Sequence, residues 1–179
     1  TIDASGMTQG GSVTQDARST AGAVTYTGSV GNDTLIMGNA ADTLTGGAGT
    51  DTLDINFDAI LGGVNVDLTS ATNQIVSMNG SAPTGTVTGF ENVDASGYIG
   101  PLGAQITGTS TGSTITGTAK DDSVLGGAGV DTSTGGAGVD AINGAGGADV
   151  IVLGDSTDGN NYDQITGFTT TSDDIKALQ

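Results

Sequence analysis

An acidic residue recurs every nine positions in two blocks of this chain, and this spacing restricts the possible folds more than any other feature. The first block begins at Gly28 and reads GSVGNDTLI, MGNAADTLT and GGAGTDTLD. The second begins at Gly108 and reads GTSTGSTIT, GTAKDDSVL, GGAGVDTST, GGAGVDAIN and GAGGADVIV. The sixth position is Asp except at Ser113, and the eighth is Leu, Ile or Val except at Ser133. A fixed period of this kind predicts a solenoid of stacked units.

Each nonapeptide predicts one turn followed by one short strand. Glycine at positions one, two and four permits positive φ and close backbone approach, so the first six residues can turn sharply. The last three residues form a strand whose middle side chain points inward. Two units then close one coil, which places Leu35 and Leu53 on one wall and Leu44 on the opposite wall. The predicted fold class is all-β, a parallel β-roll or β-solenoid, with an inserted β hairpin or small sheet.

The composition agrees with a thin core. The 179 residues include 33 Gly, only 3% are aromatic, and the hydrophobic fraction of 35% lies below the roughly 45–50% of an ordinary globular domain. Strands this short and this poor in apolar residues do not stand alone. Another interaction must therefore hold the turns together.

The charge is strongly acidic and excludes several classes of partner. Twenty acids oppose three basic residues, the net charge is −17, and Glu91 is the only glutamate. Phosphates would be repelled, so we expect no nucleic-acid partner. We expect no direct membrane insertion, because no apolar run approaches the ~18–20 residues of a membrane span. The absence of Cys and His removes thiolate and imidazole chemistry, including the commonest general base.

The recurring acids have the spacing of a calcium site. Acids 18 residues apart would lie above one another at roughly 4.7–4.9 Å and repel one another without a cation. Ca²⁺ takes six to eight oxygens from carboxylates and carbonyls, whereas Mg²⁺ demands a smaller octahedral site. The predicted metal-site residues are Asp33, Asp42, Asp51, Asp122, Asp131, Asp140 and Asp149, with the turn glycines Gly31, Gly47, Gly49, Gly127, Gly129, Gly136, Gly138 and Gly147. We expect the strongest sites where complete units stack, around Asp131, Asp140 and Asp149.

The GGxGxD units resemble the RTX, or hemolysin-type, calcium-binding repeats of secreted bacterial proteins. Residues 46–51, 126–131 and 135–140 match the motif in full. The resemblance implies Ca²⁺ as the cofactor and a secreted, extracellular location at a bacterial cell surface. Ala40 and Lys120 depart from it at position four, and Ala145 departs at position two. We expect such turns to bind weakly or to mark the ends of a roll.

The regions outside the two blocks suggest four segments. The motif IDASGM at 2–7 returns as VDASGY at 93–98, which reads either as the start of two long units or as a shared turn. We expect leading β strands and a first calcium roll (28–54) in 1–54, and an inserted β segment in 55–93. A second set of leading strands and a second roll (108–152) would occupy 94–152, and a cap would occupy 153–179.

The cap is expected to close the second roll. Its sealing residues would be Ile165, Phe168, Ile175 and Leu178. Its acids would either ligate one more calcium or lie in solvated turns; they are Asp155, Asp158, Asp163, Asp173 and Asp174. The chain begins at Thr1 without a leader, so we expect a processed chain or a piece of a longer one.

Three functions fit this pattern, and none is an enzyme, because the Asp pairs are accounted for by metal. The first is a calcium-dependent structural module of a secreted bacterial surface assembly, an S-layer lattice or filament of identical chains. RTX-type S-layer proteins are rich in Thr, Gly, Ala and Asp and lack Cys, and this chain shares that bias. The second is the C-terminal calcium-binding secretion module of a type I-secreted enzyme or toxin. The third is a calcium-stabilised adhesin or ice-binding-like surface built from flat Thr arrays.

Overall fold

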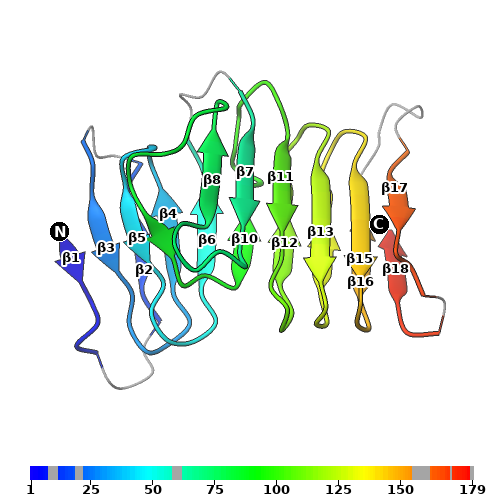
Figure 1. Ribbon diagram of the computed structural model, residues 1–179, viewed down its shortest axis with the longest axis horizontal. Coiled ribbons are helices and arrows are strands. Elements are labelled where there is room, and N and C mark those ends of the chain that lie inside the picture. The colour runs from blue at the N-terminus through cyan, green and yellow to red at the C-terminus, as the bar shows by residue number, and fades with distance from the viewer. Residues whose placement is uncertain (8–11, 19–21, 58–61, 155–161, 170, 178–179) are drawn as a thin grey trace.

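A computed structural model describes residues 1–7, 12–18, 22–57, 62–154, 162–169 and 171–177. Within these ranges the chain forms eighteen strands and no helix. The strands wind into a parallel β-solenoid of stacked coils with two walls (Figure 1). The predicted all-β solenoid is confirmed. No helix that could span a membrane is present in the described part of the chain.

One wall is a single eight-stranded sheet, called the long sheet. Its strands, in order, are β2 (Thr14–Asp16), β4 (Thr34–Met37), β6 (Thr52–Ile55), β10 (Asn92–Asp94), β12 (Thr114–Thr116), β14 (Thr132–Thr134), β16 (Val150–Leu153) and β18 (Asp174–Ala177). All of its pairs are parallel. Thr114 lies beside Thr132, and Thr132 lies beside Val150, so one coil takes eighteen residues in this region.

The opposite wall consists of two sheets. The first contains β1 (Ile2–Asp3), β3 (Thr25–Thr27), β5 (Thr43–Thr45) and β9 (Val87–Thr88). The second contains β8 (Ile75–Met78), β7 (Val64–Asp67), β11 (Ala104–Thr107), β13 (Ser123–Gly127), β15 (Ala141–Ala145) and β17 (Gln164–Thr166). Strands from the two repeat blocks therefore share one stack, in which Leu35 and Leu53 lie side by side in the long sheet and Leu44 lies on the opposite wall.

The inserted segment interrupts the eighteen-residue coil. Between β6 and β10 the register offset is 40 residues, since Thr52 lies beside Asn92. The additional chain forms an antiparallel hairpin, β7–β8, and then β9, which joins β5 in parallel. The buried Gln74 side chain fastens it, because its Nε2 donates to the carbonyls of Leu68 (3.0 Å) and Phe90 (2.8 Å). The predicted inserted hairpin is confirmed.

The core is a narrow double column of inward side chains. The middle residue of each three-residue strand is buried except Ile165 of β17, and the inward residues Leu53, Ile115 and Ile142 are fully enclosed. Larger side chains gather near the insertion, where the rings of Phe57 and Tyr98 meet edge to face at 5.8 Å.

The solenoid ends differ from the middle. Among the expected sealing residues that the structure describes, Ile165 and Phe168 pack partly buried against the core, whereas Ile175 is 46% exposed. Leu178, Asp155 and Asp158 lie outside the described residues.

The two DASG motifs form the same local turn. Ser5 N–H donates to Asp3 Oδ1 and Ser96 N–H donates to Asp94 Oδ1, both at 2.9 Å.

Candidate metal centre

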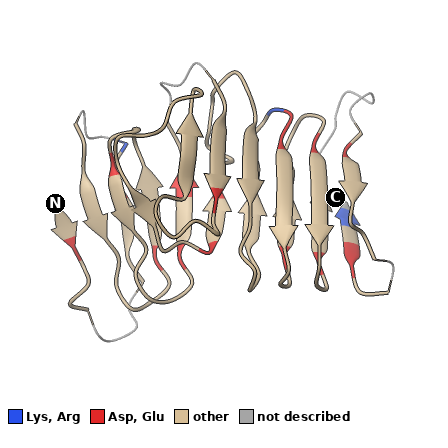
Figure 2. Ribbon diagram, viewed as in Figure 1, with Lys and Arg blue, Asp and Glu red and all other residues tan. Residues whose placement is uncertain are grey.

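Two ladders of acidic side chains run along the solenoid, each at the start of a wall's strands. The first ladder precedes strands of the long sheet and comprises Asp33, Asp51, Glu91, Asp131, Asp149 and Asp173. The second precedes strands of the opposite wall and comprises Asp42, Asp122, Asp140 and Asp163. Figure 2 shows acidic residues gathered at the turns beside the strands.

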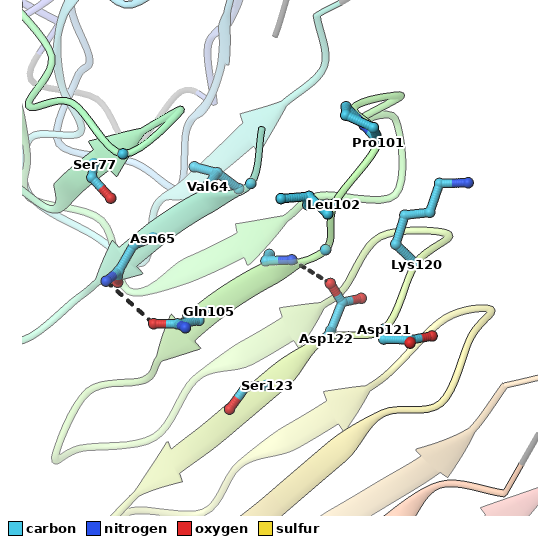
Figure 3. Close-up of a pocket in the computed structure, with 14 residues that line it drawn as sticks. Val64, Asn65, Ser77, Pro101, Leu102, Gln105, Lys120, Asp121, Asp122 and Ser123 are labelled. Carbon is cyan, nitrogen blue, oxygen red and sulfur yellow. Dashed lines mark hydrogen bonds between the residues drawn. The ribbon is translucent and has the colours of Figure 1, made fainter. Parts of the chain in front are cut away.

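Each ladder is held by a repeated hydrogen bond. One carboxylate oxygen accepts the main-chain N–H of the residue at the same level on the preceding coil. The N–H of Asp131 donates to Asp149 Oδ1 (2.9 Å), and that of Asp122 donates to Asp140 Oδ1 (2.8 Å). Figure 3 shows the rung at Asp122, which receives the N–H of Ala104. The structure thus brings the predicted pairs 131/149 and 122/140 onto consecutive rungs.

Three ladder members, Glu91, Asp163 and Asp173, lie outside the nine-residue register. The N–H of Asp51 donates to Glu91 Oε2 (2.8 Å), that of Asp140 to Asp163 Oδ1 (3.1 Å) and that of Asp149 to Asp173 Oδ1 (3.0 Å). Their offsets exceed eighteen residues because extra chain lengthens those coils. Sequence reasoning named Asp163 and Asp173 only among five cap acids and missed Glu91. A local signal marks all three, since an apolar residue follows two positions later, as Val93 follows Glu91.

The second oxygen of the carboxylate divides the acids into two groups. Oδ2 is buried and has no hydrogen-bond partner, among the described residues, in Asp51, Asp131, Asp140 and Asp149. It lies against the glycine at position one of its own unit. A Cβ built on Gly126 would be 2.6 Å from Asp131 Oδ2, and one on Gly135 would be 2.1 Å from Asp140 Oδ2. Only glycine leaves room for the oxygen there.

In the other group both oxygens are occupied. Asp33 Oδ2 accepts the N–H of Ser29, and Asp122 Oδ2 accepts the N–H of Thr118 (2.6 Å). Asp42 Oδ2 accepts the N–H groups of Gly38 and Asn39, both at 2.9 Å. These three predicted metal-site residues therefore lie in the ladders with their carboxylates already bonded to their own turns.

Burial makes ionisation of three members of the first group, Asp51, Asp131 and Asp140, unfavourable. It raises the pKa of Asp51 and Asp131 to about 6, with the neighbouring carboxylates of Asp33 and Glu91 adding to the first and that of Asp149 to the second. Burial raises the pKa of Asp140 to about 7, and Asp122, Asp163 and Asp121 add to it. A buried carboxylate without a donor at one oxygen must gain a proton or a cation to avoid this cost.

The surrounding donor set fits a hard cation. In the described ranges no three carboxylates gather at one point, so main-chain carbonyls must complete any site. Carbonyl oxygens of the preceding coil do face the turns. A Cβ built on Gly47 would lie 2.3 Å from Ser29 O, and one on Gly136 would lie 2.0 Å from Thr118 O. Carboxylate and carbonyl oxygens are the ligands that Ca²⁺ takes.

The turn glycines explain how these oxygens come together. Six of the predicted glycines have a positive φ between 109° and 136°, which are Gly47, Gly49, Gly127, Gly136, Gly138 and Gly147. Gly129 has no positive φ, but a Cβ there would lie 2.1 Å from Gly112 N. The Gly31 carbonyl faces Gly49, whose Cβ would lie 2.6 Å from it. Ala145 adopts φ 67°, so this departure from the motif still takes the left-handed conformation of a glycine.

Comparison with known proteins finds a match over both repeat blocks. The sequence model of the RTX calcium-binding nonapeptide repeat, in four copies, matches residues 25–54, 107–142 and 125–159. Repeats of this kind bind calcium. A protein from Synechocystis sp. (strain ATCC 27184 / PCC 6803 / Kazusa) named "S-layer protein" is 44% identical over 64 residues. That match spans 36% of this chain and 3% of the relative.

Proposed function

Because this chain carries RTX calcium-binding nonapeptide repeats, we propose that it is a structural module of a secreted bacterial surface assembly whose folding and assembly depend on calcium. The supporting observation is the set of four buried carboxylate oxygens without a hydrogen-bond partner within the described chain. They are costly in a metal-free fold and fit a cation. The likeness to an S-layer protein favours a lattice or filament of identical chains outside the cell.

We call a carboxylate open when its Oδ2 is buried without a hydrogen-bond partner in the described chain, as in Asp51, Asp131, Asp140 and Asp149. The residues that would hold calcium are these open carboxylates and the carbonyls beside them. When bound, the cation neutralises charge and coordinates these oxygens. The chain itself positions them, because Oδ1 of each acid stays on the N–H of the preceding coil while glycine at position one leaves space for Oδ2. Each carboxylate therefore connects its own turn to the coil before it. Binding at such a connection is coupled to folding.

The net charge makes this coupling strong. At −17 the metal-free chain repels itself, and its thin core offers little to oppose that repulsion. Each Ca²⁺ removes two charges. Extracellular calcium modules typically bind at ~10⁻⁴–10⁻³ M, which would leave the chain unfolded in a low-calcium cytoplasm and folded outside.

A structural role also agrees with a groove of about 550 Å³ over β7, β11 and β13 (Figure 3). Its buried acid, Asp122, is bonded to Ala104 N–H and to Thr118. Asn65 and Gln105 face each other across neighbouring strands at 3.5 Å. The groove's buried carboxylate is therefore engaged in holding the fold, which supports a structural rather than a catalytic role.

Two measurements test the proposal. Circular dichroism should show β structure with millimolar calcium and an expanded chain in chelator; the same β signal in both would contradict calcium-dependent folding. Negative-stain electron microscopy with added calcium should show lattices or filaments. A chain that stays monomeric in calcium would instead favour the secretion module of an enzyme or toxin.

Columns of threonine support the adhesin as a second candidate. Thr25 lies beside Thr43, and Thr27 lies beside Thr45, which lies beside Thr88. Hydroxyls in register at the strand spacing form a regular polar face. Such a face could bind a partner surface whose own groups repeat at a regular spacing. Retention of the calcium-loaded monomer on an insoluble glycan would favour this reading over assembly with identical chains.

A further inference from the structure

Position two of the nonapeptide takes one of two backbone conformations. The conformation correlates with whether Oδ2 of the Asp in the same unit accepts a hydrogen bond. Where it is left-handed, at Gly47, Gly127, Gly136 and Ala145, φ lies between 67° and 135° and Oδ2 of the unit's Asp is without a partner in the described chain. Where it is not left-handed, as at Ser29 and Thr118, its N–H donates to that Asp. The conformation at position two therefore goes with the state of the carboxylate, and residue type alone does not set it, since Gly38 also donates its N–H to Asp42 Oδ2.

A turn is called closed when a residue within it donates to Oδ2 of its own Asp. The hydroxyl of Ser or Thr at position two completes this closed form. Thr118 Oγ1 lies 2.9 and 3.1 Å from the two carboxylate oxygens of Asp122, and it accepts the N–H of Lys120 at 3.0 Å. Ser29 repeats this arrangement, with its Oγ 3.1 and 3.0 Å from the oxygens of Asp33 and 3.0 Å from the N–H of Gly31. An N–H and an O–H thus satisfy the carboxylate from within the turn.

The same closure recurs outside the full motifs. The N–H of Thr169 donates to Asp173 Oδ2 at 2.6 Å. At Thr109 the acid itself is replaced, and the N–H of Thr109 donates to Ser113 Oγ at 2.8 Å. Closed turns therefore form around a carboxylate or a hydroxyl, and they need no cation to satisfy their buried oxygens.

The closed turns at Ser29, Thr109 and Thr118 each lie one coil before an open turn, whereas the closed turn at Thr169 lies one coil after the open turn of Asp149. A Cβ on Gly47 would lie 2.3 Å from Ser29 O, one on Gly127 would lie 2.0 Å from Thr109 O, and one on Gly136 would lie 2.0 Å from Thr118 O. In the left-handed conformation of these glycines, a Ser or Thr side chain would displace these carbonyls. Open turns consequently begin one coil after a closed turn, in three separate places.

We propose that Ser29, Thr109 and Thr118 are specificity-determining residues that exclude calcium from their own turns and provide the metal-free platform on which the next calcium-binding turn stacks. This inference rests on the proposed calcium-dependent role. It removes Asp33 and Asp122 from the residues that require a cation at their own turns. It leaves Asp51, Asp131, Asp140 and Asp149 as the acids that do.

The test compares calcium stoichiometry among folded variants. The double variant Thr118→Gly/Lys120→Gly restores glycine at positions two and four of the unit with Asp122, so equilibrium dialysis should find one more bound calcium per chain than in the unchanged protein. Gly136→Thr should bind less calcium, because its side chain meets Thr118 O. Gly6→Thr is the control, since nothing lies within 4 Å of a Cβ there. An unchanged stoichiometry in the folded double variant would overturn the proposal.

A milder variant keeps the test decisive if the double variant fails to fold. Thr118→Val preserves shape and main-chain N–H but removes the acceptor of the Lys120 N–H. Amide hydrogen exchange in saturating calcium should then accelerate about tenfold at Lys120 while the stoichiometry stays the same. Unchanged exchange would refute the role of the hydroxyl. Absence of calcium binding by the unchanged chain would instead refute the proposed function, so the two failures are distinguishable.

Discussion

Replacing Asp140 with Asn should stabilise the calcium-free fold and destabilise the calcium-bound one. Asp140 is fully buried, its Oδ1 accepts the N–H of Asp122 at 2.8 Å, and its Oδ2 has no partner in the described structure. Asn keeps the acceptor at Oδ1 and removes the charge. The sign of its effect therefore depends on whether a cation is present.

The magnitude follows from the raised pKa. Burial moves the pKa of Asp140 from 3.8 to about 7. At about 1.4 kcal/mol per pKa unit, the ionised group costs the metal-free fold up to about 4 kcal/mol above neutral pH. The folded state binds the proton more tightly than the unfolded state, so stability rises as pH falls from 7 toward 3.8 and is lost as pH rises through 7. Asp140→Asn should gain about 2–4 kcal/mol in chelator at about pH 7.5.

The assay is urea unfolding monitored by circular dichroism, in chelator and in millimolar calcium. If the unchanged chain is already unfolded in chelator, the gain appears as a larger folded fraction before urea is added. Asp33→Asn is the matched control, because Ser29 and Val13 donate to both of its carboxylate oxygens. That variant should lose stability in both conditions. Destabilisation by Asp140→Asn in chelator would refute the reasoning about the open oxygen.

Three further predictions concern pH and packing. In chelator the β signal should increase from about pH 7.5 to about pH 5, as the buried carboxylates protonate, while calcium titration at the lower pH should show weaker binding. Ser133→Val should raise thermal stability in calcium by about 1–3 kcal/mol, because Ser133 Oγ is buried without a partner in the described chain. Ser133 lies between Ile115 and Ile151 in the long sheet, and a loss of stability would indicate that the larger side chain has no space there. Gln74→Ala should cost about 3 kcal/mol in urea unfolding, since three buried hydrogen bonds from the Gln74 side chain to the main chain disappear. An effect below about 1 kcal/mol would show that the hairpin does not need them.

The regular part of the fold is readable from the sequence because its geometry is periodic. Aspartates eighteen residues apart, such as Asp131 and Asp149, do lie on consecutive coils. Glu91 and the cap acids of the ladders do not follow from a fixed spacing. Extra chain in their coils lengthens the sequence separation between stacked acids, although each coil still closes. An acid placed two residues before an apolar one follows the ladder more faithfully than a fixed count does.

Whether the Oδ2 of each carboxylate has a hydrogen-bond partner is harder to predict from the sequence, because it depends on the conformation of another residue in the turn. Position six alone does not separate Asp122 from Asp140, although the unit of Asp122 departs from the motif at Thr118 and Lys120. The difference lies in Thr118, whose N–H and hydroxyl reach its acid, and in Gly136, whose positive φ turns its N–H away from this role. Ala145 shows the limit of residue type, because it adopts the left-handed form without being glycine.

The divided wall gives the solenoid an uneven response to mechanical force. The long sheet is hydrogen-bonded without interruption from β2 to β18, whereas the opposite wall is split between β9 and β8. Across that seam the main chain supplies the bond from Gln74 N–H to Val87 O (2.7 Å), and the Asn73 side chain accepts Val87 N–H (3.0 Å). Under tension along its axis the rod should therefore elongate first at the seam, with the long sheet acting as the stiff spine about which the two halves flex.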